Sequence, residues 1–278
     1  MRDMDVLFNE LSLTGQFLDQ NDFAKNGLRP LIGVLKEMEG FSTLLLKKSD
    51  VWERMVTPTG TLHSLLVDRT FDGGRLLKSK IEKLTKEPFW DSDSKQRPDS
   101  TYLLNGSDIR GSSPAEACER DKVIVSFLSS PTSSDPLPIA WNGVDVPLLN
   151  LIRPGRLTEF LWDKKKISFE AYLKARFSGG KLDFSRVDGK MRLCDIQPAE
   201  QSLFISTFKK FEGLNWERIH TDTGLDYKEY HGNIDQRYRD RKTYKFRVSR
   251  KFRCHGYREE DSFVVIGLET DHKFSDRG

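Results

Sequence analysis

Alternating apolar and basic side chains in residues 242–258 constrain the fold more than any other feature of the chain. Successive side chains of a β-strand point to opposite faces of its sheet. The apolar set is therefore predicted to face a core: Tyr244, Phe246, Val248, Phe252 and Cys254. The basic set is predicted to share the opposite, outer face: Lys245, Arg247, Lys251, Arg253 and His255. Together with the apolar run that follows, the pattern predicts strands at about 242–248, 251–258 and 262–269.

The segment before these strands has the pattern of helices. Pro198 stands where the first turn of a helix tolerates proline, and an apolar stripe follows it: Leu203, Phe204, Phe208 and Phe211. A second short helix is predicted within 215–231, and a short strand at 190–196 precedes both helices. Residues 189–278 are thus predicted to form a strand, two helices and an antiparallel meander of three strands.

Residues 1–188 are predicted to form a separate domain of α+β type, since 278 residues leave room for two domains of ordinary size. Apolar residues recur at helical spacing over about 20–39, and Gly40 is a suitable stop signal. The run at 121–130 predicts a buried strand. The predicted fold class is therefore α+β, in two domains, 1–188 and 189–278.

Charge is nearly balanced over the whole chain but concentrated near its end. The chain has 45 Lys and Arg residues against 42 Asp and Glu residues, and this balance by itself indicates no class of partner. Residues 237–258, however, contain ten Lys or Arg residues against one acidic residue, Asp240. Like charges on adjacent strands repel, so such clustering costs stability unless an anion is bound. A cationic face of this kind fits the phosphate backbone of a nucleic acid.

The residues alone leave several interpretations of this basic face open. In the first interpretation, it is simply a solvated face of a basic domain. In the second, it binds nucleic acid without catalysing a reaction. In the third, it also stabilises the charge that develops at phosphorus during a reaction. An acidic protein partner is a further alternative. The residues predicted to contact nucleic acid are Arg239, Arg241, Lys251, His255 and Lys273.

The last third of the chain resembles the C-terminal part of RelE/ParE-type toxins. The resemblance rests on Gly232 before the meander, the aromatic-Lys-aromatic-Arg-Val strand at 244–248, Phe252-Arg253, and His272-Lys273 after the last strand. One departure from the family is that no Tyr closes the last strand. The resemblance implies a RelE-like domain, in which two helices precede an antiparallel sheet.

Members of the RelE branch are small metal-independent ribonucleases that cut mRNA, often on the ribosome. The resemblance implies attack of the RNA 2′-hydroxyl on the adjacent phosphate, with Lys245 or His272 as the base. The catalytic residues that it implies are Lys245, Arg247, Arg253 and His272. The two arginines would hold the phosphate, while His255 or Lys273 would protonate the leaving oxygen. The ParE branch inhibits a topoisomerase instead, so the resemblance does not fix the activity.

The segments FNELSLTGQF and TKEPFW resemble parts of uncharacterised bacterial proteins that occur among phage-defence genes. This resemblance implies a sensing, regulatory or recruiting role for residues 1–188. The predicted function is thus a toxin-type endoribonuclease that acts in anti-phage defence. Its predicted partners are RNA or the ribosome, and an antitoxin or another defence protein. The alternatives are a non-catalytic module that binds nucleic acid or the ribosome, and an interaction subunit of a defence complex.

Several other classes of function lack their motifs in this sequence. There is no P-loop and no dinucleotide fingerprint, so no cofactor is predicted. Cys118, Cys194 and Cys254 have no zinc-finger spacing and are predicted to be reduced thiols of a cytoplasmic protein. Neither a signal peptide nor an apolar run of about 18–20 residues is present, so no membrane contact is predicted. The acidic residues near Lys273 do not have the spacing of a metal nuclease, and no metal site is predicted.

Overall fold

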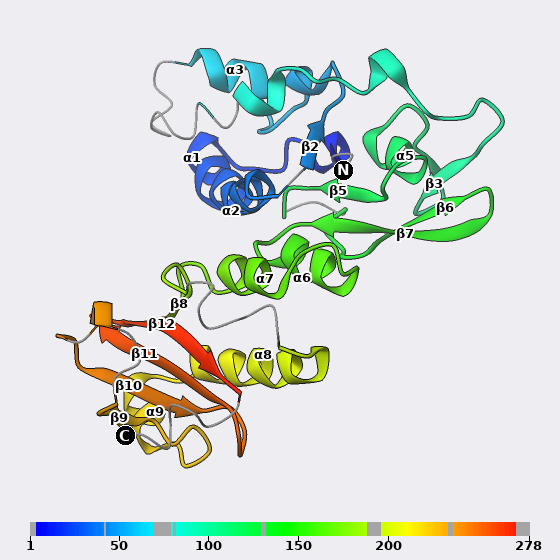
Figure 1. Cartoon of the computed structure of the whole chain (residues 1–278). Coiled ribbons are helices and arrows are strands. Elements are labelled where there is room, and N and C mark those ends of the chain that lie inside the picture. Colours follow the sequence, from blue (N-terminus) through cyan, green and yellow to red (C-terminus); the bar gives the residue numbers. More distant parts are fainter. Residues whose placement is uncertain are drawn as a thin grey trace. The chain divides into compact units, whose positions relative to one another are not determined.

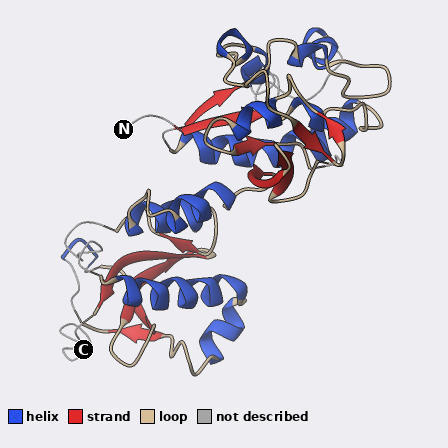
Figure 2. Cartoon of the chain, turned by 90° about the vertical axis from the view of Figure 1, so that its right-hand side faces the viewer, coloured by secondary structure: helices blue, strands red, loops and turns tan. Residues whose placement is uncertain are grey.

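The computed structural model describes residues 4–41, 43–68, 79, 82–128, 132–187, 196–232, 236–238 and 240–270. The chain divides into two compact units, Met1–Leu157 and Thr158–Gly278. Each unit is built around its own sheet (Figures 1 and 2), and we call them the N-terminal and the C-terminal unit. None of the helices in the described ranges has the length and apolar character that crossing a membrane requires.

The N-terminal unit contains a seven-stranded mixed sheet with the order β2-β1-β5-β7-β6-β3-β4. The first four strands in this order are parallel, whereas β6, β3 and β4 extend the sheet in antiparallel pairs. The strands are β1 (Met4–Phe8), β2 (Thr43–Leu46), β3 (Tyr102–Leu104), β4 (Ser107–Asp108), β5 (Val123–Val125), β6 (Leu137–Trp141) and β7 (Val144–Leu151).

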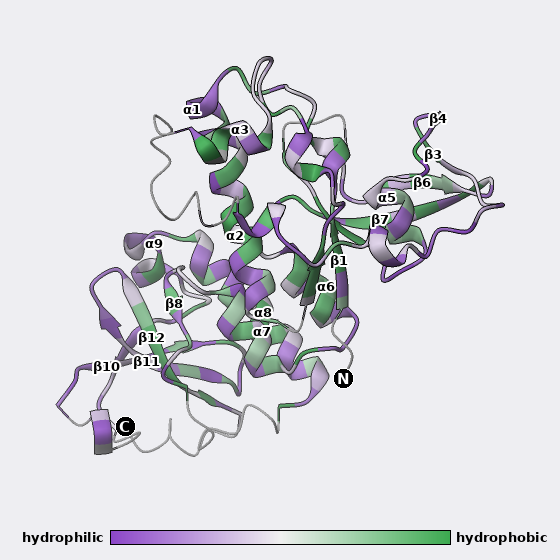
Figure 3. Cartoon of the chain, turned by 90° about the horizontal axis from the view of Figure 1, so that it is seen from above, coloured by the Kyte–Doolittle hydropathy of each residue, from purple (hydrophilic) through white to green (hydrophobic). Residues whose placement is uncertain are grey.

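Strands β1 and β5 are buried at every residue, and Figure 3 shows green, hydrophobic stretches in the sheet near the label of β1. Parallel strands that are covered on both faces have nearly continuous apolar sequences, which explains why these two segments do not alternate. The predicted strand within 121–130 is confirmed as β5. The short helical elements of the unit are η1 (Glu10–Ser12), η3 (Val51–Glu53), α3 (Leu62–Val67), η4 (Asp91–Asp93) and α5 (Ser113–Cys118).

The helix predicted at about 20–39 is confirmed as one helical segment with a π-helical stretch in its middle. Its three parts are α1 (Gln20–Asp22), η2 (Phe23–Leu28) and α2 (Arg29–Glu39). Asp19 caps its start, because the Asp19 carboxylate accepts hydrogen bonds from two backbone N–H groups. Pro30 is the second residue of α2, directly after the π-helical stretch. Gly40 follows as the C-cap.

The C-terminal unit contains a five-stranded sheet with the order β8-β12-β11-β10-β9. Strands β9 to β12 are antiparallel, but β8 pairs with β12 in parallel, so the sheet is mixed rather than wholly antiparallel as predicted. The strands are β8 (Leu182–Asp183), β9 (Lys228–Tyr230), β10 (Thr243–Arg247), β11 (Arg253–Glu259) and β12 (Ser262–Glu269). The helices are α6 (Arg156–Asp163), α7 (Phe169–Arg176), α8 (Pro198–Gly213), α9 (Trp216–Thr221) and the 3-10 turn η7 (Gln236–Tyr238).

The three predicted meander strands are confirmed as β10, β11 and β12, and the two predicted helices as α8 and α9. Helix α8 packs its phenylalanines against the sheet, with the rings of Phe211 and Phe246 stacked at 4.7 Å between centroids. Phe204 and Phe208 are fully buried in the same cluster. Leu203, predicted on the same stripe, is 45% exposed, because one residue along a helix turns the side chain by about 100°. The strand predicted at 190–196 falls outside the described residues, apart from Ile196.

The boundary between the two units falls between Leu157 and Thr158, whereas the sequence predicted a boundary between residues 188 and 189. The difference arises because most of α6, together with α7 and β8, belongs to the C-terminal unit. Phe169, Tyr172 and Leu182 are buried in the same cluster as Phe246. Apolar residues in 139–186 do not recur with a clear helical or strand period. The sequence therefore does not show which of the two sheets the short elements of this segment pack against. At the coarse level of mixed helices and strands, the predicted fold class is confirmed.

Candidate functional site

The antiparallel register of β10 and β11 brings four of the predicted basic residues together. Lys245 lies directly opposite His255, and Arg247 lies directly opposite Arg253. Directly opposed residues of an antiparallel pair share one face of the sheet. This face is opposite to the one that packs Phe246 into the core of the unit. The predicted shared face of these four residues is therefore confirmed.

A β-bulge adds an acidic residue to this face. The register of β11 and β12 shifts between His255 and Gly256, which leaves Ile266 of β12 as the extra residue. Beyond the bulge the alternation of β12 changes phase, as an inserted residue requires. Leu268 therefore packs into the core, and Glu269 lies opposite Arg253 on the basic face. We call Lys245, Arg247, Arg253, His255 and Glu269 the β10–β12 site.

His255 and Glu269 form a buried pair at the centre of this site. Nε2 of His255 lies 2.8 Å from Oε2 of Glu269, and both side chains are 0% exposed. Nδ1 of His255 is buried without a hydrogen-bond partner in the described part of the chain. The carboxylate thus orients the imidazole through one nitrogen, and the other nitrogen has no hydrogen-bond partner in the described ranges. An imidazole that a carboxylate orients in this way is a common part of general acid–base sites.

Lys245 and Tyr230 complete the surroundings of the histidine. The ring of Tyr230 meets the ring of His255 edge to face, with 5.0 Å between centroids. Nζ of Lys245 lies over the same tyrosine ring, 4.9 Å from its centroid, which is a cation–π contact. Burial lowers the pKa of Lys245, and the positive charge of Lys228 on β9 lowers it further. Burial, followed by the charge of Arg247, likewise lowers the pKa of Arg253.

The predicted outer position of the basic set is wrong for Lys245 and His255. Lys245 is only 8% exposed and His255 is fully buried. The physical reason is that the same face also carries large apolar side chains, since Tyr257, Val264 and Ile266 form a second buried cluster there. Alternation correctly sorts side chains between the two faces of a sheet, but it does not establish which face is open to solvent.

The arginines of the site are tied to neighbouring groups. Nη2 of Arg247 donates to Oδ2 of Asp226 at 2.7 Å, and its side chain is 40% exposed. Nη1 of Arg253 donates to the backbone carbonyls of Ser249 and Phe252, at 2.7 and 2.9 Å. Lys251 lies exposed in the turn between β10 and β11.

Carboxylates from outside the basic segment offset part of its charge. Besides the Arg247 contact, ion pairs to other elements join Arg241 with Glu259 at 3.1 Å and Lys242 with Glu229 at 2.7 Å. Guanidinium Cζ of Arg241 also lies 4.4 Å from the centroid of the Tyr257 ring. In the folded unit, acidic residues of β9 and β11 lie beside the basic segment. They therefore partly offset the local excess of positive charge that the sequence shows in residues 237–258.

Three predicted site residues, Arg239, His272 and Lys273, lie outside the described residues. Within the described ranges, no group of three His, Cys, Asp or Glu side chains is arranged to hold a metal ion. Asp261, one of the acidic residues near the C-terminus, instead accepts a hydrogen bond of 2.6 Å from Nε1 of Trp216.

The N-terminal unit has a buried polar cluster where its parallel strands end. Open sheets of parallel strands often bind ligands at the carboxyl ends of the strands. Here the side chains satisfy one another: Nδ2 of Asn9 donates to Oγ of Ser126 and to Oγ1 of Thr132, at 2.9 and 3.2 Å. Oε1 of Glu10 accepts a 2.9 Å hydrogen bond from the backbone N–H of Ser113, and burial raises the pKa of Glu10. This cluster therefore connects η1, α5 and the loop after β5.

Comparison of the chain with protein-family models, curated proteins and solved structures finds no match. The resemblance to RelE/ParE-type toxins therefore stays a prediction, and the site rests on its own geometry.

Sequence reasoning missed Glu269 as the partner of His255, and it did not single out Tyr230. Glu269 is the first charged residue after the apolar run from Phe263 to Leu268. A charge at that position could have marked a buried pair. Its face, however, depends on the bulge opposite Gly256, and the alternation of β12 alone places Glu269 on the core side.

Proposed function

We propose that the C-terminal unit is a toxin-type endoribonuclease that cleaves RNA without a metal ion. The observation that carries the proposal is the strand register, which sets Lys245 beside His255 and Arg247 beside Arg253 on one face. Cleavage of a phosphodiester needs proton-transfer groups together with cations that stabilise charge on phosphorus. The β10–β12 site brings both kinds of group together.

In the proposed reaction the RNA 2′-oxygen forms a bond to the adjacent phosphorus, and the bond from phosphorus to the 5′-oxygen breaks. Neutral Lys245 or His272 accepts the proton of the 2′-hydroxyl, and His255 or Lys273 donates a proton to the leaving oxygen. The products are a 2′,3′-cyclic phosphate and a 5′-hydroxyl. The lowered pKa of Lys245 favours its role as the base, because more of the amine is neutral near physiological pH.

The arginines supply the charge that this reaction needs. The side chain of Arg247 is 40% exposed, and its guanidinium is paired with Asp226. Arg253 is held by backbone carbonyls through one nitrogen. A guanidinium has five N–H donors, so both side chains keep donors for the phosphate oxygens of a substrate.

A second candidate function is RNA binding without cleavage, and the burial of His255 and Lys245 favours it. In this alternative, the exposed cations Arg247 and Lys251 contact phosphates, while His255 and Glu269 are a structural pair. Binding through phosphates weakens steeply with salt. The two functions therefore share a binding surface and differ in whether the buried residues take part in chemistry.

The decisive experiment incubates the full chain with end-labelled single-stranded RNA in the presence of EDTA. We expect products that end in a 2′,3′-cyclic phosphate. Arg253→Ala and Lys245→Met should each reduce the cleavage rate at least about a hundredfold, the typical contribution of one positioned proton-transfer or charge-stabilising group. Lys166→Ala is the matched control, because it removes one exposed lysine of the same unit outside the site.

The outcomes separate the candidates. Salt-dependent RNA binding without any product supports the binding module and contradicts the nuclease. Cleavage that is unchanged in both site variants contradicts the assignment of the site. If the chain neither binds RNA at low salt nor cleaves it, both candidates fail, and a stoichiometric acidic protein in a pull-down then supports an interaction subunit.

The proposed toxin role is tested in bacteria. We expect expression of the chain to arrest growth and Arg253→Ala to relieve the arrest at equal protein levels. The proposed cellular partners are mRNA or the ribosome, with an antitoxin or another anti-phage defence protein as the restraining partner. Equal arrest by the wild type and by Arg253→Ala contradicts a toxin role for this site.

A further inference from the structure

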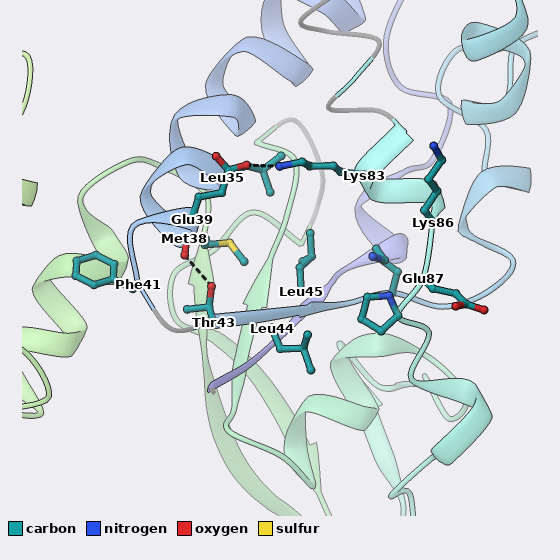
Figure 4. A pocket seen from close by; sticks show the side chains of 12 residues that line it. Leu35, Met38, Glu39, Phe41, Thr43, Leu44, Leu45, Lys83, Lys86 and Glu87 are labelled. Carbon is teal, nitrogen blue, oxygen red and sulfur yellow. Dashed lines mark hydrogen bonds and ion pairs between the residues drawn. The ribbon is translucent and has the colours of Figure 1, made fainter. Parts of the chain in front are cut away.

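A pocket of about 450 Å³ lies in the N-terminal unit, between the end of α2, strand β2 and residues 83–88. Its volume is in the range of about 300–1,000 Å³ that small-molecule sites occupy. Figure 4 shows Leu35 and Met38 from α2 on one side, and Leu44 and Leu45 from β2 on another. The lining is thus largely apolar.

Lys47 is the buried polar residue of this pocket. It follows the last residue of β2, and only 2% of its surface is exposed. Its backbone is held on both sides, since its N–H donates to the carbonyl of Pro88 and its carbonyl accepts from the N–H of Trp90. The position of Lys47 is therefore set by a bridge between β2 and the segment that forms the opposite wall of the pocket.

No carboxylate in the described part of the chain neutralises the Lys47 ammonium. Glu39, on the rim, is instead paired with Lys83 at 2.6 Å, as the dashed line in Figure 4 shows. Lys86 is paired with Glu82 at 3.3 Å. Burial lowers the pKa of Lys47 to about 8, and no charged side chain in the described ranges raises it. Most of the amine is still protonated at about pH 7, so a cation remains in an apolar site without a counter-charge.

A buried charge without a partner is costly, and a bound anion removes that cost. We propose that this pocket binds a small organic anion with an apolar body, and that the anionic group pairs with Lys47. The leucines, Met38 and Pro88 contact the apolar body. A single anionic group is the best fit, because the other two lysines of the pocket already have carboxylate partners. This binding site is separate from the proposed nuclease site and does not depend on it.

Anilinonaphthalene sulfonate tests the proposal, because it joins one negative charge to an aromatic body of suitable size. Phenylnaphthylamine is the matched neutral probe, since it has the same body without the sulfonate. Titration of the full chain, followed by probe fluorescence, should show one saturable site for the sulfonate and weaker binding of the neutral probe. Lys47→Met should weaken sulfonate binding at least about tenfold, the loss expected for a charged hydrogen bond. It should leave binding of the neutral probe nearly unchanged.

Lys86→Met is the control variant, because it removes an exposed lysine from the same pocket. Its sulfonate affinity should stay within about twofold of the wild type. A second measurement needs no variant: wild-type affinity for the sulfonate should fall between about pH 7 and about pH 10 as Lys47 loses its proton. The proposal is overturned if the wild type binds no sulfonate, if Lys47→Met binds it as tightly as the wild type, or if the wild-type affinity is independent of pH.

Discussion

Lys245 and Lys47 are both buried lysines, and their surroundings give them different roles. Nζ of Lys245 lies over the ring of Tyr230, and the negative charge of Glu269 partly offsets the effect of burial on its pKa. For Lys47, burial is the cause that lowers the pKa. Lys245 belongs to a cluster with His255 and Glu269, which suits a proton-transfer role, whereas Lys47 lines a largely apolar pocket, which suits a counter-charge for a ligand.

Replacing Lys47 should change how stability depends on pH. The folded-state pKa of about 8 is below the ordinary value of 10.5 for a lysine, so the unfolded chain binds this proton more tightly. The contribution of Lys47 to the free energy of unfolding therefore rises as the pH increases from about 8 to about 10.5. This contribution is least favourable below about pH 8. Lys47→Met should be more stable than the wild type by about 1–3 kcal/mol at about pH 7, and the difference should shrink at about pH 10.

Urea unfolding of both proteins at the two pH values measures this difference. Because the comparison is between variants, contributions from the C-terminal unit cancel. A Lys47→Met protein that is less stable than the wild type at about pH 7 contradicts an uncompensated buried charge. A constant difference at both pH values contradicts a lowered pKa.

At the scale of elements, the bulge between β11 and β12 decides which residues meet. It lies next to Gly256, where an added Cβ atom would come within 2.3 Å of the backbone oxygen of Val264 and within 2.6 Å of the Phe263 ring. Glycine is therefore required for the close approach of the two strands at this point. The change of phase beyond the bulge then places Glu269 beside His255.

Gly256→Ala should destabilise the chain by about 1–3 kcal/mol, because the added methyl group overpacks a site enclosed by backbone and a buried ring. Gly213→Ala is the matched control, since a Cβ atom there meets nothing within 4 Å at the end of α8. That control should be neutral or stabilising by up to about 1 kcal/mol. Urea midpoints of the full-length variants provide the measurement, and equal midpoints for the two variants contradict the role of Gly256.

At the scale of the whole molecule, the boundary between the two units depends on which hydrophobic core each segment packs into. No change in amino-acid composition marks this boundary. Residues 91–114, which are rich in Ser and Asp, lie within the N-terminal unit and mark no boundary. The actual division occurs within α6, where Leu157 and Thr158 fall in different units. Helix α7 and strand β8 supply Tyr172, Leu173 and Leu182 to the core of the C-terminal unit.

A fragment of residues 189–278 should therefore fail to fold cooperatively, whereas a fragment of residues 154–278 should fold. The shorter fragment loses several fully buried side chains, each of which contributes about 1.5–3 kcal/mol. This loss is comparable with the entire stability of a domain, about 5–15 kcal/mol. Circular dichroism during urea unfolding distinguishes the two fragments. A cooperative transition at the same midpoint in both would show that α6, α7 and β8 are dispensable.

The pattern of apolar and polar residues along the chain predicted those segments whose conformation depends on residues nearby in the sequence. The alternation in 242–258 predicted the meander and the shared face of Lys245 and Arg247, and the periodicity of 20–39 predicted a helix. Both follow from the backbone geometry of a single segment. Residues 139–186 were not predicted, because several short elements there take their conformation from the sheets against which they pack.

The sequence by itself determined the kinds of element at the C-terminal end and the face of the sheet that Lys245, Arg247, Arg253 and His255 share. It did not determine the place of Lys251, which was predicted on that face and lies in the turn between β10 and β11. Only the tertiary structure decided that Lys245 and His255 are buried, that Glu269 joins them, and that Lys47 lies in a pocket without a counter-charge. The physical reason is that burial and pairing depend on which distant segments pack together. The bulge opposite Gly256 and the bridge between Lys47 and Phe89 alter the burial and pairing of side chains. Neither feature is visible in the local pattern of the sequence.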